Sequence, residues 1–160
     1  MIIILDFDNT IFDTRAFQEE YIVFGEPYPT SFKKDDLKKF IFPDVWDFFE
    51  QTKGKHRIFL ATFGDEVFQR AKVEASGVSH FFEELFFTGG EMKGGPLARR
   101  FSDTGESVVF VDDDPFQLAS VQDSAPYIKT IQIERGADEQ DMTPGAIRDM
   151  SELSGIIEIA

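Results

Sequence analysis

The sequence contains no cysteine, and it has only two histidines among its 160 residues. The lack of cysteine excludes disulfide bonds, thiolate metal sites and cysteine nucleophiles. Basic residues are also scarce, since 16 Lys and Arg stand against 30 Asp and Glu, which gives a net charge of -14. A protein this acidic repels the phosphate backbone of nucleic acid and anionic membrane surfaces, so neither is expected among its partners.

Long apolar runs are missing as well. The opening run Met1–Leu5 stops at Asp6, far short of the roughly 20 apolar residues of a membrane-spanning helix. No signal peptide or membrane anchor is therefore expected, and the lack of cysteine fits a cytoplasmic protein. No repeat, low-complexity segment or shift in composition divides the chain. A single domain over residues 1–160 is therefore expected.

Five short apolar runs lack strict alternation, which is typical of parallel strands covered on both faces. They are residues 2–6, 57–62, 84–88, 108–112 and 128–133. Segments with helical spacing lie between them, at 45–52, 66–76, 96–101 and 115–122. Strands that alternate with helices predict right-handed βαβ units. The expected fold class is therefore α/β, a Rossmann-like three-layer α/β/α sandwich with a five-stranded parallel sheet.

Two regions fall outside this alternation of strands and helices. Residues 15–43 contain prolines and many aromatic residues, which predict a small irregular or helical insertion after the first strand, or a minimal cap. This segment is called the insertion below. The polar stretch 136–149 predicts a surface loop before a short last element near residues 153–159.

Two carboxylates, Asp6 and Asp8, come directly after the first predicted strand. Strand geometry would point them to opposite faces. If the chain leaves the strand at Phe7, both can instead turn toward one site, where one acts as nucleophile and the other transfers a proton. An acidic turn with Asp caps is the structural alternative for this fragment alone.

Polar residues with related chemistry follow three further strands. Thr62 ends the second strand, where its hydroxyl could hold a phosphate oxygen or simply cap a helix. Lys93 lies in a glycine-rich loop that could bring its ammonium group to a phosphoryl group. The acidic run Asp112–Asp114 follows the fourth strand. Because the carboxyl ends of parallel strands form one ligand-binding edge, and oxygen ligands suit Mg²⁺, the set predicts phosphoryl transfer with magnesium.

In this order, the four motifs resemble those of phosphohydrolases of the haloacid dehalogenase (HAD) superfamily. The resemblance implies that Asp6 attacks phosphorus, while Asp8 protonates the leaving group and then activates water. Thr62 and Lys93 would be the second and third motifs. Mg²⁺ would be held by the Asp6 side chain, the Asp8 backbone carbonyl and Asp113.

The last motif leaves its register open by one residue, so Asp112 is an alternative ligand or a close neighbour of the metal site. Family members often carry a further acid where this chain has Gln117. Family dehalogenases generally lack the second acid of the first motif, so Asp8 favours phosphate chemistry. The predicted function is a Mg²⁺-dependent phosphatase that hydrolyses a phosphate monoester through an aspartyl-phosphate.

The substrate class follows from the short insertion. Larger family members carry a cap domain that closes over small substrates, whereas this chain leaves room for a minimal cap at most. An open site would admit a phosphoprotein as well as a small phosphorylated molecule.

Two other functions are carried as alternatives. One is a catalytically silent family member that serves as a binding module, which Gln117 and the missing cap would fit. The other is a receiver-type phosphoacceptor domain. It would need a lone acceptor Asp on the third strand, which here ends at Thr88.

Overall fold

The computed structural model describes the backbone of residues 1–159, and five parallel strands in it form one sheet with the order β3-β2-β1-β4-β5. The strands are β1 (Ile2–Leu5), β2 (Arg57–Thr62), β3 (Glu84–Phe87), β4 (Val108–Asp112) and β5 (Ile128–Gln132). Every strand falls within a predicted run, and the predicted α/β fold class is confirmed. Strand β1 lies at the centre of the sheet, so the acids that follow it reach the middle of the carboxyl edge.

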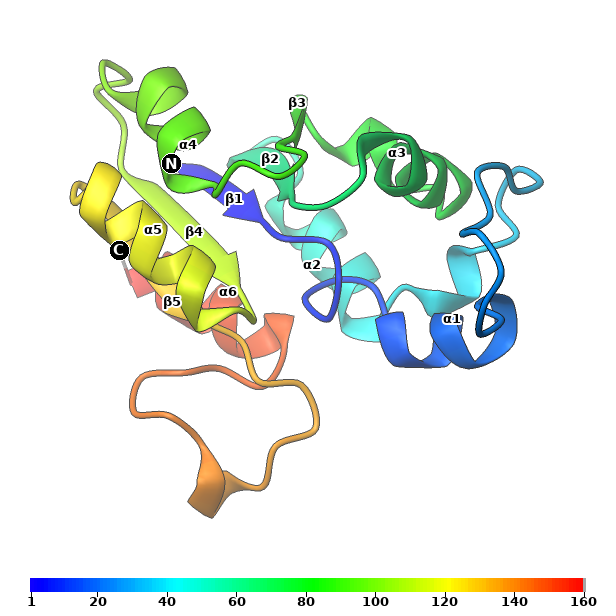
Figure 1. The fold of residues 1–160 in the computed structure, drawn as a ribbon. Helices are drawn as coiled ribbons and strands as arrows, with labels where there is room; N and C mark the ends of the chain where they lie inside the picture. Colours follow the sequence, from blue (N-terminus) through cyan, green and yellow to red (C-terminus); the bar gives the residue numbers. More distant parts are fainter. Residues whose placement is uncertain (160) are drawn as a thin grey trace.

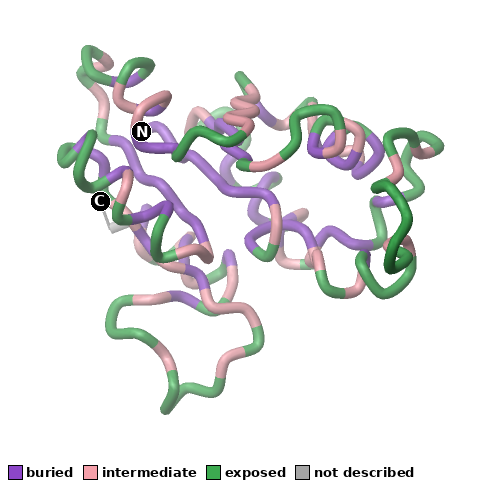
Figure 2. Tube along the Cα trace, in the orientation of Figure 1, coloured by how far each residue is buried: buried purple, intermediate pink, exposed green. Residues whose placement is uncertain are grey.

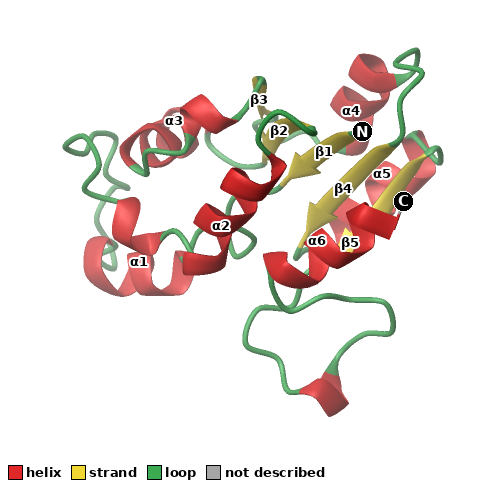
Figure 3. Cartoon of the chain, turned by 180° about the vertical axis from the view of Figure 1, so that it is seen from behind, coloured by secondary structure: helices red, strands yellow, loops and turns green. Residues whose placement is uncertain are grey.

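Six helices connect and cover the strands (Figure 1). They are α1 (Thr14–Tyr21), α2 (Pro43–Thr52), α3 (Glu66–Ala75), α4 (Gly94–Phe101), α5 (Pro115–Ser124) and α6 (Met150–Ile159). Single 3-10 turns occur at Lys38–Phe40, Ser79–Phe81 and Glu139–Asp141. Helices α2 and α6 cover one face of the sheet, while α4 and α5 cover the other (Figure 3). Within residues 1–159, every helix is too short or too polar to cross a lipid bilayer.

Two hydrophobic cores lie on the two faces of the sheet. In β1, Ile3 and Leu5 pack into the core beneath α2 and α6, whereas Ile2 and Ile4 pack into the core beneath α4 and α5. All four side chains are at most 1% exposed, and burying each stabilises the fold by about 1.5–3 kcal/mol. Since both faces are covered, the central strands are buried along their length (Figure 2). This double burial is why the strands read as continuous apolar runs.

Helix boundaries follow local signals in the sequence. The Asp65 side chain accepts a hydrogen bond from the Phe68 backbone N–H at 2.9 Å and so caps the start of α3. Beyond the end of α3, Gly77 has φ of +76°, the left-handed conformation that stops a helix. Pro115 opens α5, and the preceding Asp114 accepts a hydrogen bond from the Phe116 backbone.

Helix α4 begins at Gly94, two residues before the predicted start at residue 96. The early start places Lys93 directly at the helix N-terminus, where α4 packs closely against α5. The Gly94 backbone N–H donates to the Ser120 hydroxyl at 3.1 Å. A Cβ atom at position 94 would overlap the Ser120 backbone carbonyl. Only glycine therefore fits this contact.

Substitution of Gly94 by alanine is expected to destabilise the protein by about 1–3 kcal/mol. The new Cβ would overlap the Ser120 backbone carbonyl, which cannot move aside as a flexible side chain can. Urea unfolding of Gly94→Ala measures the loss. Gly90→Ala is the matched control, since a Cβ there meets nothing within 4 Å. Equal stability of the two variants would show that α4 and α5 do not approach as closely as described.

The insertion contains α1, an irregular stretch and one 3-10 turn. Aromatic side chains fasten it to the core, because the Phe17 ring centroid lies 5.4 Å from that of Phe12 and 5.8 Å from that of Phe40. Phe12 belongs to the loop that carries the first acids. The insertion is therefore anchored directly beside the carboxyl edge of the sheet, next to α3 (Figure 1).

The loop after β5 also contacts that edge. Its Arg135 forms an ion pair with Asp44 of α2, with 2.8 Å between Nη1 and Oδ1. The same guanidinium donates to the Thr10 backbone carbonyl at 2.8 Å. The rest of the loop is largely exposed, as the predicted surface segment 136–149 requires. Arg135 thus braces the turn that follows β1.

Candidate active site

The loop after β1 turns sharply at Phe7. The Asp6 backbone N–H still donates to Val111 of β4 at 2.9 Å, so Asp6 extends the sheet by one hydrogen bond. Asn9 then adopts φ of +61°, a left-handed conformation that asparagine tolerates better than most residues. The turn brings the Thr10 hydroxyl back to donate to Asp6 Oδ2 at 3.0 Å. The chain therefore leaves the strand at Phe7, as expected if Asp6 and Asp8 are to reach the same site.

Lys93 joins the first and last acidic motifs. Its Nζ lies 2.6 Å from Asp6 Oδ1 and 2.6 Å from Asp112 Oδ2, and the residue is 1% exposed. Burial favours the neutral amine, but the attraction of the two carboxylates is stronger and raises the pKa of Lys93 above its ordinary value. Lys93 is thus a buried cation at the site and not a solvated loop lysine.

Three carboxylates crowd around this ammonium group. Asp6, Asp112 and Asp113 each offer an oxygen, and these oxygens lie within 4.8 Å of one another. Burial raises the pKa of Asp112 to about 7, and Asp6 adds to the shift while Lys93 opposes it. Burial and the charges of Asp6 and Asp112 raise the pKa of Asp113 to about 8. One lysine therefore does not balance the negative charge of the cluster.

This donor set fits a divalent cation. Carboxylate oxygens are the ligands that Mg²⁺ prefers, and the raised pKa values indicate charge that a cation would relieve. Asp112 is 1% exposed, and its oxygens bind Lys93 and the Asp114 backbone N–H, the latter at 2.9 Å. Asp113 is less buried and borders the same cavity. The geometry therefore favours Asp113 over Asp112 as a direct ligand.

The metal-free protein is expected to lose stability as the pH rises from about 5 to about 8. A carboxyl group whose pKa is higher in the folded state than in the unfolded state binds its proton more tightly when folded, so that stability falls through this window. Surface acids whose pKa is lowered by their partners titrate below it. Because Asp113 is partly exposed and screened by solvent, a loss of about 2 kcal/mol is expected.

Urea unfolding at several pH values in EDTA measures this slope. Asp113→Asn should flatten it, because the amide does not titrate, and saturating Mg²⁺ should flatten it in the wild-type protein. A stability that rises between pH 5 and 8 without divalent cations would show that the acidic cluster is not strained by its own charge.

Asp8 belongs to the same loop, but its carboxylate meets a different set of partners. Its Oδ1 accepts from Lys72 Nζ at 2.6 Å and from the Thr14 hydroxyl at 2.8 Å. Its Oδ2 accepts from Gln69 Nε2 at 3.0 Å. The Asp8 side chain is 25% exposed, whereas Lys72 is only 2% exposed. Asp8 is thus held in place by α1 and α3 while one side of it stays open.

Lys72 and Gln69 were missed in the sequence, where α3 reads as an ordinary covering helix. A signal was present, because the buried stripe of α3 runs through Gln69, Lys72, Val73 and Ser76 at spacings of three and four residues. Two long polar side chains on a buried stripe need partners. Their partner is the carboxylate of Asp8.

Thr62 ends β2 at the same edge of the sheet, because the register aligns Leu60 with Leu5, next to Asp6. The residue is 1% exposed, and its hydroxyl oxygen has no hydrogen-bond partner among the described residues. A buried hydroxyl without a partner costs about 1–3 kcal/mol. A ligand oxygen bound at this strand end would satisfy it.

Gln117 replaces the expected further acid and has a different task. The residue is 3% exposed, and its Oε1 accepts a hydrogen bond from the Lys93 backbone N–H at 2.9 Å. Gln117 therefore fixes the position of the lysine from the neighbouring helix α5. It adds no negative charge to the acidic cluster.

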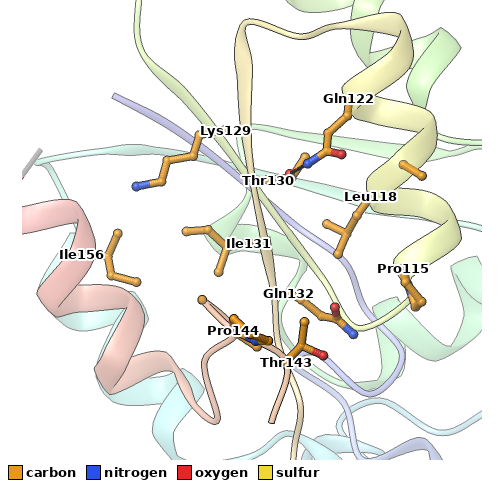
Figure 4. A pocket seen from close by; sticks show the side chains of 13 residues that line it. Pro115, Leu118, Gln122, Lys129, Thr130, Ile131, Gln132, Thr143, Pro144 and Ile156 are labelled. Atoms are coloured by element: carbon orange, nitrogen blue, oxygen red, sulfur yellow. Dashed lines mark hydrogen bonds between the residues drawn. The ribbon is translucent and has the colours of Figure 1, made fainter.

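A cavity of about 210 Å³, called the acidic cavity below, lies among the acids and Lys93, whereas Thr62 is not among the residues that line it. Asp6, Asp8, Lys93 and Asp113 line it, together with the exposed ring of Phe63. A larger groove of about 570 Å³ lies elsewhere, between α5, β5 and the loop after β5 (Figure 4). No carboxylate lines that groove, whereas the smaller cavity is lined by Asp6, Asp8, Asp112 and Asp113.

Comparisons with known proteins identify the fold. No protein-family model matches the sequence, and no curated protein matches it either. Solved structures do match. A haloacid dehalogenase-like hydrolase from Burkholderia xenovorans is 15% identical, with a TM-score of 0.71, and the match covers 95% of this chain and 96% of the other.

Two further structures extend this comparison. A HAD hydrolase from Bacillus subtilis, solved with bound magnesium, is 12% identical, with a TM-score of 0.67 and coverage of 98% of this chain and 97% of the other. A dehalogenase is also 12% identical, with a TM-score of 0.65 and coverage of 97% and 96%. At these identities the likeness establishes the shared fold.

Proposed function

We propose that this chain, which has the fold of the haloacid dehalogenase-like hydrolases, is a Mg²⁺-dependent phosphatase that cleaves phosphate monoesters through an aspartyl-phosphate on Asp6. One observation carries the proposal. The Asp6 carboxylate is held between Lys93 and Thr10, on the wall of a cavity that also exposes a second, separately positioned acid, Asp8.

The side chains of Asp6 and Asp113 and the backbone carbonyl of Asp8 would hold the metal ion. When bound, Mg²⁺ would supply positive charge against the phosphoryl oxygens and the attacking carboxylate. Lys93, which lines the cavity, adds a positive charge of its own. The unpartnered hydroxyl of Thr62 is available to donate to a phosphoryl oxygen.

The reaction then proceeds in two displacements. An oxygen of Asp6 attacks phosphorus, and the bond to the ester oxygen breaks as Asp8, which enters this step in its protonated form, gives that oxygen a proton. Asp8, now a carboxylate, takes a proton from water. The resulting nucleophile attacks the phosphorus and releases inorganic phosphate from Asp6. Lys93 and Thr10 keep the attacking carboxylate oriented through both steps.

Asp8 also distinguishes phosphate chemistry from dehalogenation, which occurs on the same fold. An alkoxide leaving group needs a proton, whereas a halide ion departs without one. Here three side chains, Lys72, Gln69 and Thr14, position the second carboxylate. Three hydrogen-bond donors that position a proton-transfer group favour an ester substrate, whose leaving group needs a proton.

The first test is hydrolysis of 4-nitrophenyl phosphate with Mg²⁺ and with EDTA. Turnover that depends on Mg²⁺ is expected. No turnover of this ester or of acetyl phosphate, under conditions where the folded protein binds Mg²⁺, would contradict the phosphatase proposal and favour a silent binding module.

Replacing Asp8 by asparagine is expected to lower kcat by about 10²–10⁴, the usual contribution of a positioned proton-transfer group. Binding of inorganic phosphate and Mg²⁺ should change little, because the backbone carbonyl and Asp6 remain. Steady-state kinetics and calorimetry measure the two effects. The melting temperature must be followed as well, since Lys72 loses its charged partner.

Asp13→Asn provides the matched control for Asp8→Asn. Asp13 lies in the same loop and caps α1 through the Ala16 backbone N–H, and asparagine caps equally well. Its kcat should stay within about twofold of the wild-type value. Full activity of Asp8→Asn would remove Asp8 from the proton-transfer role.

A further inference from the structure

A second, smaller cavity of about 130 Å³ adjoins the acidic cavity on the far side of Asp8. It is lined by residues of α1, the loop that follows α1, and α3. Asp8 lines both cavities and so forms part of the wall between them. The smaller one is called the aromatic pocket below.

Three aromatic rings form part of the wall of the aromatic pocket, and Asp8, Thr14, Gln18, Gln69 and Lys72 add polar side chains to it. Phe17 and Phe68 line it, and the Tyr28 ring stacks on Phe68 with 4.9 Å between ring centroids and 27° between ring planes. A cavity of about 150 Å³ with apolar walls holds one benzene molecule. The aromatic pocket therefore matches a single six-membered ring and is too small for a nucleoside.

Gln69, which lines this pocket, has a buried polar atom without a partner. Gln69 is 7% exposed, and its Nε2 donates to Asp8 Oδ2. A carboxylate can only accept hydrogen bonds, so the amide must present Nε2 to Asp8 and direct Oε1 elsewhere. Among the described residues, Gln69 Oε1 has no hydrogen-bond partner. A ligand with an N–H or O–H group would satisfy it.

The charges at the base of the pocket already balance. Lys72 Nζ lies 2.6 Å from Asp8 Oδ1, and the lysine is 2% exposed. A negatively charged ligand would have to break this ion pair, and a positively charged one would compete with Lys72 for Asp8. The pocket therefore suits a neutral ligand.

The position of Asp8 assigns the role of the pocket. Asp6 attacks phosphorus in the acidic cavity, and the leaving oxygen departs roughly opposite to it. Since Asp8 protonates that oxygen, the leaving group must extend from the acidic cavity past Asp8. We propose that the aromatic pocket binds the leaving group, and that the substrate is a phosphate ester of a neutral, ring-sized alcohol or phenol carrying a hydrogen-bond donor. This assignment rests on the proposed phosphatase function.

Binding of the alcohol half can be measured without catalysis. Phenol and toluene have the same shape, but only phenol can donate to Gln69. In ¹⁵N NMR titrations, phenol should shift the side-chain amide signals of Gln69 and bind about fivefold more tightly than toluene. Equal affinities, or shifts confined to other parts of the protein, would overturn the assignment.

A pocket-filling variant gives a second readout. Gln18 lines the pocket from the exposed side of α1, so Gln18→Phe should fill it without disturbing the core. The ratio of kcat/KM for phenyl phosphate to that for acetyl phosphate should fall about tenfold. Glu19→Phe is the matched control, since Glu19 is exposed on the same helix and lines none of the cavities described above. Its ratio should match that of the wild-type protein.

The two proposals fail in different ways. If the wild-type protein hydrolyses acetyl phosphate but Gln18→Phe leaves the ratio unchanged, the pocket assignment is wrong and the phosphatase proposal stands. If the wild-type protein hydrolyses neither ester, the phosphatase proposal fails and the leaving-group role fails with it. A shift of the Gln69 amide by phenol would then support a ring-binding site alone.

Discussion

Asp6→Asn should lower kcat for 4-nitrophenyl phosphate by at least about 10⁴-fold, since loss of a nucleophile leaves only the remaining binding and electrostatic contributions. The amide cannot attack phosphorus and is a poorer ligand for Mg²⁺ than a carboxylate. Its size and shape match those of aspartate, so the hydrogen bond to Thr10 can be replaced by an equivalent one. Activity should therefore disappear from a folded protein.

The folded state of this variant should hold because the substitution removes one of three crowded carboxylates. Lys93 keeps Asp112 as its partner at 2.6 Å. The melting temperature should be equal to or higher than that of the wild type in EDTA. Asp65→Asn is the control, because Asp65 caps α3 from an exposed position and asparagine is as good a cap. Normal turnover by Asp6→Asn would rule out Asp6 as the nucleophile.

Lys93→Met should destabilise the metal-free protein by about 3–5 kcal/mol, the usual effect of removing one partner from a buried ion pair. Methionine fills much of the same space, so the loss comes from charge. Asp6 and Asp112 would remain buried without their shared cation, next to Asp113. Urea unfolding in EDTA measures the change.

Magnesium should restore part of this stability, since a divalent cation would replace the missing positive charge. Lys129→Met, at an exposed position of β5, should change stability by less than about 0.5 kcal/mol. If Lys93→Met were as stable as the wild type in EDTA, the lysine would not be the cation that holds the acidic cluster together.

The positions of the strands along the chain were predictable because both faces of the sheet are covered. Continuous apolar runs such as 108–112 are a direct consequence of that burial. Since Asp6, Thr62 and Asp113 lie at or directly after the ends of β1, β2 and β4, the topology alone brings them to one edge. Helix caps such as Asp65 were equally predictable, because they depend only on neighbouring residues.

Contacts between distant residues were not predictable in the same way. The pairing of Asp8 with Lys72 joins residues 64 positions apart, and it depends on how α3 is rotated against the loop after β1. The sequence marked Gln117 as a departure from the family pattern. Only the structure shows that its side chain binds the Lys93 backbone. The start of α4 at Gly94 likewise depends on a close approach to Ser120 of another helix.

The central claim is that a phosphoryl group is transferred to Asp6, and trapping that intermediate tests it most directly. Asp8→Asn is the suitable protein, because 4-nitrophenolate leaves without a proton while hydrolysis of the intermediate still needs Asp8. Acid quenching in the presence of Mg²⁺, followed by peptide mass spectrometry, should find one phosphoryl group on Asp6. A phosphoryl group on another residue, or turnover by the wild type with no labelled Asp6 in this variant, would contradict the mechanism.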